Sequence, residues 1–346
     1  MYTVKEMNIL QDINLAAYST MRLGGNAAYL VEVATETELK EAAAWAAQNS
    51  LPVLMIGSGS NIVWRDEGYP GLVIVDKISG FEVKEDEFGT YLSVGAGENW
   101  DSVVLRSVDL GLTGIECLTL IPGSAGATPI QNVGAYGQEI SQTLVTLSAY
   151  NFTTGMMETL AAGDCQFSYR NSIFKTNPGK YLITSITLML RKGSMMPPFY
   201  PSLNNYLNEH HVTDCSPASI RQAVMAIRQN KLPDPSKVAN CGSFFGNPEV
   251  DKDTLSVLQE NYPGIPNWPT DSGKAKLSAA WLIDQAGFAH YTDQETGIAT
   301  WPQQPLVFIN QGAKSTAALL SFADKVKSSV LNKFGVELNQ EPLLLP

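Results

Sequence analysis

A stretch near the middle of the chain restricts the possible folds more than any other feature. Residues 121–137, IPGSAGATPIQNVGAYG, contain four glycines and two prolines but no charged side chain. Long surface loops normally carry charge, and long ordered loops without it are usually functional. Glycine at this density lets backbone N–H groups approach a flat or anionic ligand closely. We therefore expect a ligand-binding loop here.

The sequence on both sides of this loop predicts a mixture of strands and helices. Apolar runs of strand length alternate with segments of helical periodicity over short connections, which is typical of an α+β fold. The expected strands are 29–33, 52–57, 71–77, the hairpin 81–97, 143–151, 156–160 and 180–191, and the expected helices are 34–50 and 99–110.

The composition changes near residue 200, where we expect a second domain to begin. Helices predicted at 217–231, 277–288 and 315–335, with a strand at 305–310, form a smaller α+β unit. The sequence therefore predicts two domains, residues 1–200 and residues 201–346.

The charge balance and the scarce residue types exclude several function classes. With 23 Lys+Arg against 34 Asp+Glu the net charge is −11, which disfavours nucleic acid or an anionic membrane as a partner. The three histidines and four cysteines have no metal-ligand spacing, so we expect neither a metal site nor a Ser-His-Asp hydrolase. There is no secretory signal and no apolar run of membrane-spanning length, so we expect a cytoplasmic protein.

The common nucleotide-binding motifs do not occur either. GSGSNI at 57–62 follows a predicted strand, but Ile62 replaces the third glycine of a dinucleotide fingerprint, and GAGENW at 95–100 has Trp100 at that place. A P-loop and a G-x-S-x-G nucleophile elbow are missing. The remaining feature is a pair of glycine-rich loops in the N-terminal half, which suits a phosphate-bearing cofactor bound by backbone amides outside the Rossmann scheme.

Seven strings in a fixed order carry a resemblance to a known family. They are PVLMIGSGSN (52–61), VGAGENW (94–100), IPGSAGATPIQNVGAYGQE (121–139), YRNSIFK (169–175), KLPDP (231–235), GSFFGNP (242–248) and KLSAAWLID (276–284). Each string alone is weakly diagnostic, but their order is specific, and the resemblance covers residues 14–341. The chain resembles the UDP-N-acetylenolpyruvoylglucosamine reductase (UDP-N-acetylmuramate dehydrogenase) family, in the branch with a substrate-covering tyrosine loop.

This resemblance implies both a fold and a reaction. Residues 1–200 would form an FAD-binding domain of the PCMH or vanillyl-alcohol-oxidase type, with two lobes that divide near residue 70. Residues 201–346 would bind substrate, and the 336–346 tail would return to the flavin site. Hydride would pass from NADPH to FAD and then to UDP-N-acetyl-3-O-(1-carboxyvinyl)glucosamine, giving UDP-N-acetylmuramate for peptidoglycan. We expect a monomer whose partners are NADPH and this UDP-sugar.

The resemblance also assigns three catalytic residues. Hydride transfer to the enolpyruvyl group builds negative charge beside its carboxylate, so the reaction needs a cation there and a proton donor at the carbanionic carbon. Arg170 matches the family's catalytic arginine, whose planar fork suits a carboxylate. Ser243 matches the proton donor. Glu341 matches the third catalytic residue, although here a proline follows the glutamate instead of preceding it.

Further residues are expected to bind the cofactor and the substrate. The two glycine-rich loops would contact FAD through Gly57, Ser58, Gly59, Ser60, Asn61, Gly123, Ser124, Gly126, Ala127, Gln131, Asn132, Gly134 and Ala135. The substrate would contact Tyr169, Tyr200, Lys231, Asn247 and Lys274, with Lys276 as a weaker candidate. Tyr200 would lie over the sugar nucleotide.

Two other interpretations of the residues remain open. An FAD oxidase of the same domain type, acting on a sugar or a hydroxy acid, would often hold its flavin covalently through histidine or cysteine. The N-terminal half has no histidine, and Cys117 and Cys165 do not lie in the expected loop. A UDP-sugar or flavin-binding sensor without catalysis is disfavoured because all three expected catalytic residues are present.

Overall fold

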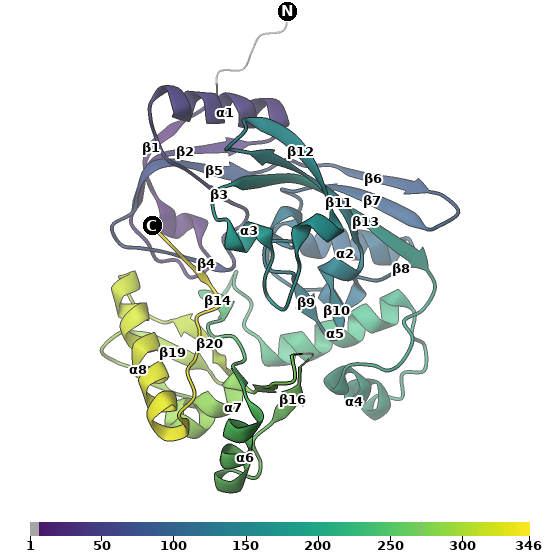
Figure 1. Ribbon diagram of the computed structural model, residues 1–346, viewed down its shortest axis with the longest axis vertical. Helices are drawn as coiled ribbons and strands as arrows, with labels where there is room; N and C mark the ends of the chain where they lie inside the picture. The colour runs from purple at the N-terminus through teal and green to yellow at the C-terminus, as the bar shows by residue number, and fades with distance from the viewer. Residues whose placement is uncertain (1–6, 271) are drawn as a thin grey trace, which may run out of the picture. The chain divides into compact units, whose positions relative to one another are not determined.

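The chain folds into two compact units, and each is described by itself (Figure 1). The computed structural model describes residues 7–270 and 272–346. Unit 1 consists of Met1–Ile13, Ala27–Ser58 and Tyr69–Asn230, and unit 2 consists of Asn14–Asn26, Gly59–Gly68 and Lys231–Pro346.

The first sheet of unit 1 is mainly parallel. Its strand order is β1-β2-β5-β3, formed by β1 (Leu10–Asn14), β2 (Asn26–Val33), β5 (Tyr69–Asp76) and β3 (Val53–Ile56). Because β2 and β3 both run parallel to β5, the chain must cross over between β2 and β3, and helix α1 (Glu36–Gln48) makes this crossover. The helix begins at Thr35, whose hydroxyl caps the amide of Glu38, and its Leu39 packs with Leu72 and Ile74 of β5.

The second sheet of unit 1 is antiparallel and has the order β12-β11-β13-β7-β6. Its strands are β6 (Phe81–Glu85), β7 (Thr90–Gly95), β11 (Leu144–Asn151), β12 (Met156–Ala161) and β13 (Tyr181–Lys192). The long β6–β7 hairpin of Figure 1 turns at Asp86, whose carboxylate accepts hydrogen bonds from the amides of Phe88 and Gly89. Helix α2 (Trp100–Asp109) packs in the same core as this sheet.

Two helices that follow the second sheet also belong to unit 1. They are α4 (Pro201–Glu209) and α5 (Pro217–Lys231). Leu203 and Ile220 pack in one buried cluster with Cys117, and Arg221 of α5 forms a 3.0 Å ion pair with Asp101 of α2. These contacts tie the two helices to the preceding residues.

The domain boundaries therefore differ from those that the sequence predicted. The compact units divide after Asn230, not at residue 200, because α4 and α5 share a core with unit 1. The first sheet continues through Asp76, so it also extends beyond the lobe division predicted near residue 70. Unit 2 takes two short segments from the N-terminal part of the chain, which no sequence pattern indicated.

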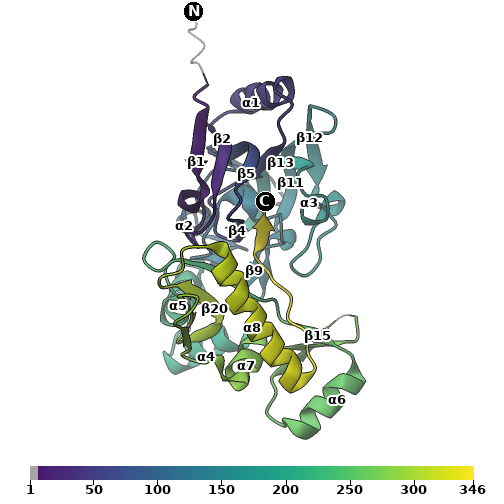
Figure 2. The same ribbon diagram turned by 90° about the vertical axis from the view of Figure 1, so that its left-hand side faces the viewer.

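The described residues of unit 2 form two small sheets, a parallel strand pair and three α-helices. The sheets have the orders β14-β20-β19-β18 and β15-β17-β16, and β21 pairs with β4. Their strands are β4 (Ile62–Trp64), β14 (Asn240–Ser243), β15 (Glu249–Val250), β16 (Asn267–Pro269), β17 (Ala275–Leu277), β18 (Thr292–Asp293), β19 (Ile298–Trp301), β20 (Gln304–Asn310) and β21 (Leu343–Leu345). The helices are α6 (Lys252–Asn261), α7 (Ala279–Ile283) and α8 (Thr316–Phe334), of which α8 is the long yellow helix in Figure 2.

Residues from the N-terminal part of the chain lie in the core of unit 2. Met21, Leu23 and Val63 are buried in the same cluster as Phe308 and Phe322. At the start of α8, the hydroxyl of Ser315 accepts a hydrogen bond from the Ala318 amide, and the Asp66 carboxylate accepts bonds from the amides of Thr316 and Ala317. These bonds fix segment 59–68 to α8, the helix of unit 2 that is furthest from this segment in the sequence.

Short elements complete the two units. These are β8 (Leu112–Thr113), β9 (Gly134–Ala135), β10 (Gln138–Glu139), α3 (Ile173–Thr176), and single turns of 3-10 helix at Leu15–Tyr18, Glu116–Leu118, Ala125–Ala127, Ile140–Gln142 and Ala162–Cys165.

The mixed α+β class predicted from the sequence is confirmed. The helix expected at 277–288 is shorter than predicted: α7 ends at Ile283, and a π-helical turn follows over Asp284–Phe288, where Gly287 has φ 92°. Across residues 7–270 and 272–346, none of the helices is long and apolar enough to cross a membrane.

Candidate active site

The glycine-rich loop predicted at 121–137 packs against the end of β7 in unit 1. The amide of Gly126 donates a hydrogen bond to the carbonyl of Ala96 at 2.8 Å. A Cβ atom placed on Gly126 would lie 2.5 Å from the Cβ of Ala96, so only glycine fits here. β9 and β10 form a small hairpin at the end of the loop. The loop is therefore an ordered part of unit 1.

The two glycine-rich loops expected to bind FAD contact each other within unit 1. A Cβ atom on Gly57 would lie 2.2 Å from the Oγ of Ser124 and 3.8 Å from the Cβ of Ala127. The two glycine-rich loops thus lie side by side, which suits a ligand with phosphates and a flat ring system, since glycine lets backbone amides approach it. The residues present fit an FAD cradle.

One of the predicted FAD contacts, Asn132, uses its side chain for hydrogen bonds within unit 1. The side chain of Asn132 is buried and fully used inside unit 1: its Nδ2 donates to Glu139 and to the carbonyl of Ser168, and its Oδ1 accepts from the Ser141 amide. Any contact of Asn132 with FAD must therefore come from its backbone.

The loop at 57–61 is divided between the units. Gly57 and Ser58 belong to unit 1, whereas Gly59, Ser60 and Asn61 belong to unit 2. In unit 2, a Cβ atom on Gly59 would lie 2.1 Å from the carbonyl oxygen of Tyr18, so this part of the loop is tightly packed as well.

Arg170 lies in a tight turn of unit 1 and has an unusual backbone conformation. Its φ of 55° is in the left-handed region, which a residue with a long side chain seldom adopts. Ser168 and Asn171 close the turn with reciprocal backbone hydrogen bonds of 3.2 and 3.1 Å. The guanidinium donates from Nη2 to the carbonyl of Gly134 at 3.2 Å, and its Cζ lies 5.2 Å from the centroid of the Tyr169 ring. The turn thus brings the expected catalytic arginine to the end of the glycine-rich loop.

Tyr200 is positioned by a residue that the sequence analysis missed. It lies directly before α4, is 46% exposed, and its ring makes an edge contact with the Tyr136 ring at a centroid distance of 5.8 Å. Tyr136 belongs to the glycine-rich loop and has a left-handed φ of 50°. The signal was present in the sequence, because Tyr136 is the one aromatic residue in the glycine-rich loop.

Arg228 of α5 is the second residue that the sequence analysis missed. Its Nη2 donates to the carbonyl of Leu120 at 3.2 Å, and its guanidinium also interacts with Tyr136, so it holds both ends of the glycine-rich loop. Burial raises the pKa of the Tyr136 hydroxyl, and the charge of Arg228 opposes this shift. Burial also lowers the pKa of Arg228. No periodicity or motif links residue 228 to residues 120 and 136.

Ser243 and Glu341 come together in unit 2. Ser243 ends β14 and is followed by the buried Phe244, whose carbonyl accepts a hydrogen bond from the amide of Glu341 at 3.0 Å. Phe245 and Gln340 form a β-bridge at the same place. The backbone of the expected third catalytic residue therefore runs beside the expected proton donor.

The charge of Glu341 is also felt by the residue two positions before Ser243. Burial, together with a smaller contribution from the negative charge of Glu341, raises the pKa of the Cys241 thiol to about 12. Cys241 is therefore an unreactive, neutral thiol, and the shift of its pKa shows that the Glu341 carboxylate lies nearby.

The C-terminal tail is fixed in unit 2 beside the divided loop. β21 pairs in parallel with β4, and the amide of Leu343 donates to the carbonyl of Asn61 at 3.0 Å. Proline after Glu341 does not prevent this placement, since the strand begins one residue beyond it. Glu341 and the expected FAD contact Asn61 thus lie on adjacent segments of one unit.

The substrate-binding residues expected in unit 2 lie on separate segments of the chain. Asn247 lies at the start of α7, where its Oδ1 accepts a hydrogen bond from the amide of Ala279 at 3.0 Å. Lys231 and Lys274 are exposed, and the neighbouring Lys276 lies on β17. The carbonyl groups of Pro235 and Ser236, just after Lys231, are held by Arg22.

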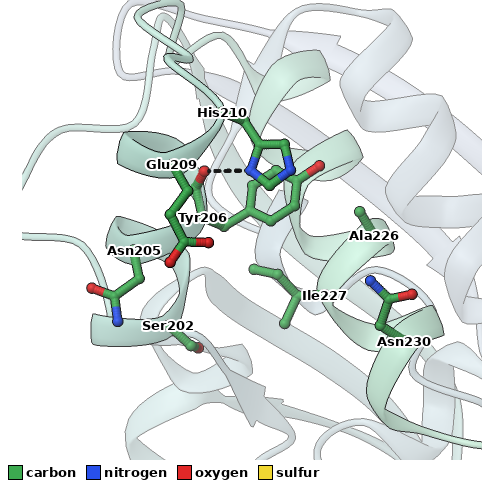
Figure 3. A pocket seen from close by; sticks show the side chains of 8 residues that line it. All are labelled: Ser202, Asn205, Tyr206, Glu209, His210, Ala226, Ile227 and Asn230. Atoms are coloured by element: carbon green, nitrogen blue, oxygen red, sulfur yellow. Dashed lines mark hydrogen bonds between the residues drawn. The ribbon is translucent and has the colours of Figure 1, made fainter.

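Unit 1 also contains a groove between two of its helices. It has a volume of about 410 Å³ and opens between α4 and α5, where the ring of His210 stacks on Tyr206 at 4.0 Å (Figure 3). It is lined by Ser202, Asn205, Tyr206, Glu209, His210, Ala226, Ile227 and Asn230. None of the expected catalytic or binding residues lines it, so we do not assign it to the reaction. In the described part of the chain, no group of three His, Cys, Asp or Glu side chains could hold a metal ion.

Comparison with known proteins defines first the class and then the family. The FAD binding domain model matches residues 27–160, so FAD is the cofactor of the chain. The model of the UDP-N-acetylenolpyruvoylglucosamine reductase C-terminal domain matches residues 234–345. Together with the fold, these matches define an FAD-dependent oxidoreductase with an FAD-binding domain of the PCMH type and a separate C-terminal domain.

Full-length relatives specify the family. The chain is 39% identical to the UDP-N-acetylenolpyruvoylglucosamine reductase of Amoebophilus asiaticus over 337 residues, which cover 97% of this chain and 98% of that protein. It is 37% identical to the Chromobacterium violaceum reductase, with 96% and 98% covered. The chain belongs to the UDP-N-acetylenolpyruvoylglucosamine reductase family. The predicted resemblance is thus confirmed, and the sugar oxidase and sensor interpretations lose their support.

Solved structures support the fold. The reductase from Thermus caldophilus aligns with a TM-score of 0.67 at 22% identity and covers 99% of both chains. A 6-hydroxy-D-nicotine oxidase from Arthrobacter nicotinovorans aligns with a TM-score of 0.51 at 10% identity, over 97% of this chain and 88% of that one. The fold is therefore common to enzymes with different substrates, and the family must be argued from sequence.

Proposed function

We propose that this protein reduces UDP-N-acetyl-3-O-(1-carboxyvinyl)glucosamine to UDP-N-acetylmuramate, with NADPH as the source of electrons. Family membership supports this function, and the observation that carries it is the approach of Glu341 to the segment of Ser243 in unit 2. When bound, FAD supplies hydride transfer from NADPH to the substrate. The loop residues 57–61 and 123–135 would hold it.

Arg170 binds the substrate carboxylate in this proposal. Its guanidinium can make two parallel hydrogen bonds to the carboxylate and stabilises the enolate-like charge that develops when hydride reaches the terminal methylene carbon. The left-handed turn and the bond to Gly134 orient this side chain before substrate arrives. Preorganisation of this kind lowers the barrier because the cation need not reorient during the reaction.

Ser243 donates the proton to the carbon next to the carboxylate. The product gains one hydride at the methylene carbon and one proton at this neighbouring carbon, so the double bond becomes a single bond and the charge balances. A serine hydroxyl is a weak acid, but the short-lived carbanion is a strong base, so the transfer is favourable. Glu341 lies beside this segment and assists on the carboxylate side of the same carbon.

The remaining roles follow from the substrate. Tyr200 covers the sugar nucleotide. The ring of Tyr136 contacts Tyr200, and Arg228 interacts with Tyr136. Lys231, Asn247 and Lys274 bind the uridine diphosphate. Residues 1–200 carry FAD, and residues 201–346 carry the substrate apart from the helices of 201–230, which pack in unit 1. We propose a monomer in the cytoplasm, where NADPH and UDP-sugars are available.

The test separates the two half-reactions by stopped-flow absorbance of the flavin. Ser243→Ala should leave flavin reduction by NADPH nearly unchanged, because that step protonates no carbon. Flavin reoxidation by the enolpyruvyl substrate should slow by about 10²- to 10⁴-fold, the usual effect of a positioned acid. Ser243→Cys should recover part of the rate, because a thiol still donates a proton.

Ser256→Ala is the matched control, since the hydroxyl of this exposed serine of α6 donates to the carbonyl of Lys252 within its own helix. It should leave both half-reactions unchanged. Equal slowing of both half-reactions by Ser243→Ala, or no slowing, would show that Ser243 is a structural residue and that the proton comes from elsewhere.

A further inference from the structure

The backbone of Arg170 is held in a conformation that its own side chain disfavours. Its φ of 55° is one of few left-handed values among residues with long side chains in unit 1. Such conformations persist only where neighbouring groups hold them, and they are concentrated at functional sites. The contacts that hold this backbone therefore control where the guanidinium points.

Three contacts hold the turn around Arg170. Ser168 and Asn171 bond to each other through their backbones, and the side-chain Nδ2 of Asn132 donates to the carbonyl of Ser168 at 3.3 Å. The third contact is direct: the ammonium of Lys175 donates to the carbonyl oxygen of Arg170 itself at 3.1 Å. Among these contacts, only that of Lys175 places a full charge on the peptide group of the strained residue.

Lys175 is itself firmly placed. It lies in the short helix α3, which begins at Ser172, and the Ser172 hydroxyl accepts hydrogen bonds from the amides of Phe174 and Lys175. The same hydroxyl donates to the carbonyl of Ile130 in the glycine-rich loop at 2.6 Å, and Phe174 is buried. The stem of Lys175 therefore starts from a fixed point of unit 1, and its ammonium is half-buried where it meets the Arg170 carbonyl.

These contacts give Lys175 a use in the reaction. A hydrogen bond from a charged donor is stronger than one between neutral groups, so it can offset the backbone strain at Arg170. Without it, the peptide of Arg170 can return to a relaxed conformation, and its guanidinium leaves the position beside Gly134. A displacement of about 1 Å from productive geometry costs on the order of 100-fold in rate.

We propose that Lys175 is a positioning residue for the reduction, and that it acts through the backbone of Arg170 by holding this arginine in its left-handed turn. The inference rests on the proposed role of Arg170. Lys175 touches neither substrate nor cofactor in this proposal.

The experiment is a double-mutant cycle on the FAD-loaded enzyme. Lys175→Met removes the donor but keeps the apolar stem. We expect flavin reduction by NADPH to be unchanged and flavin reoxidation by the enolpyruvyl substrate to slow by about 10- to 100-fold. In the Arg170→Ala background, Lys175→Met should cause no further slowing, because Lys175 acts only through Arg170. Lys175→Arg, which keeps a charged donor, should recover part of the rate.

Lys180→Met is the matched control. This lysine lies a few residues further along the same part of unit 1, and its ammonium stacks over the ring of Tyr181 at 5.0 Å instead of holding the turn. It should leave both half-reactions unchanged. FAD content and melting temperature, measured for every variant, separate an effect on positioning from a loss of the fold, and Lys175→Gln provides a second variant if Lys175→Met is unstable.

The possible outcomes are distinguishable. If Lys175→Met and Arg170→Ala have multiplicative effects, Lys175 acts on the substrate or cofactor directly and the proposal is overturned. If Lys175→Met and Lys175→Gln fold, bind FAD and reoxidise at the normal rate while Arg170→Ala is slow, the proposal also fails but the proposed function stands. If Arg170→Ala itself reoxidises at the normal rate, the proposed role of Arg170 is wrong.

Discussion

Asp76 should make the stability of unit 1 depend on pH in the opposite sense to most carboxylates. It is the last residue of β5, only 9% exposed, and its Oδ1 accepts a hydrogen bond from the amide of Ile78 at 2.8 Å. Burial raises the pKa of this carboxyl from 3.8 to about 7, and the Ile78 amide and the charge of Lys77 only partly oppose the shift. The folded protein therefore holds this proton more tightly than the unfolded chain does.

The sign and the size of the effect follow from this shift. Below pH 4 the carboxyl is protonated in both states and does not change stability. As the pH rises from about 4 to about 7, the unfolded chain releases the proton more readily than the folded one, so stability falls. Above pH 7 the loss is complete, and a shift of about three pKa units at about 1.4 kcal/mol each gives a loss of about 4 kcal/mol.

Asp76→Asn tests this directly, because the amide oxygen can still accept the bond from Ile78 while the titratable charge is removed. The variant should be more stable than the wild type by up to about 4 kcal/mol at pH 8, and the gain should disappear near pH 4. Urea unfolding followed by circular dichroism at a series of pH values measures the difference. Asp86→Asn, at the exposed β6–β7 turn, is the control for loss of a carboxylate that accepts backbone hydrogen bonds. A gain that is equal at pH 5 and pH 8, or a variant that is less stable at pH 8, would refute the reasoning.

Two further predictions concern packing and an ion pair. Gly126→Ala should lower FAD affinity by at least about 10-fold, because the new methyl group would push the loop away from Ala96 in a well-packed core. Fluorescence titration measures the affinity, and Gly163→Ala is the control because the space at its Cβ position is open. Unchanged affinity of Gly126→Ala would contradict the packing argument. Lys325→Met leaves the buried carboxylate of Asp293 without the ammonium that lies 2.8 Å from it and that, chiefly by its hydrogen bond, lowers the pKa of Asp293. The variant should melt at a lower temperature at pH 7, and the difference should shrink as the pH falls below about 4, where the unfolded carboxyl is also protonated; a difference that grows on acidification would exclude this explanation.

Local patterns predicted most elements because the local and the tertiary signals agree. α1, for example, lies within the helix expected at 34–50, and β6 and β7 form the hairpin expected at 81–97. The end of α7 was predicted less well, since the backbone is left-handed at Gly287, inside the expected helix, where glycine permits this conformation.

The candidate site was predictable only where a residue is recognisable from its own neighbours in sequence. Arg170 and Ser243 lie in strings that carry the family resemblance. Tyr136 and Arg228 act through contacts between distant segments, and no local pattern encodes such contacts. The compact units divide after Asn230 for the same reason, because the apolar face of α5 does not itself indicate which core it covers.

The interleaving of the two units sets an order in which the protein can fold during synthesis. The strands of both sheets of unit 1 are complete once residue 192 has been made, but unit 2 requires Asn14–Asn26 and Gly59–Gly68 together with the last strand, β21. The N-terminal segments, with Met21, Leu23 and Val63, must therefore wait for their core until residues as late as Leu338 have been made. Closing such long loops is slow. A ribosome that stalls in the second half of the message would leave a chain whose first half exposes apolar surface, and that chain would be a substrate for chaperones and proteases.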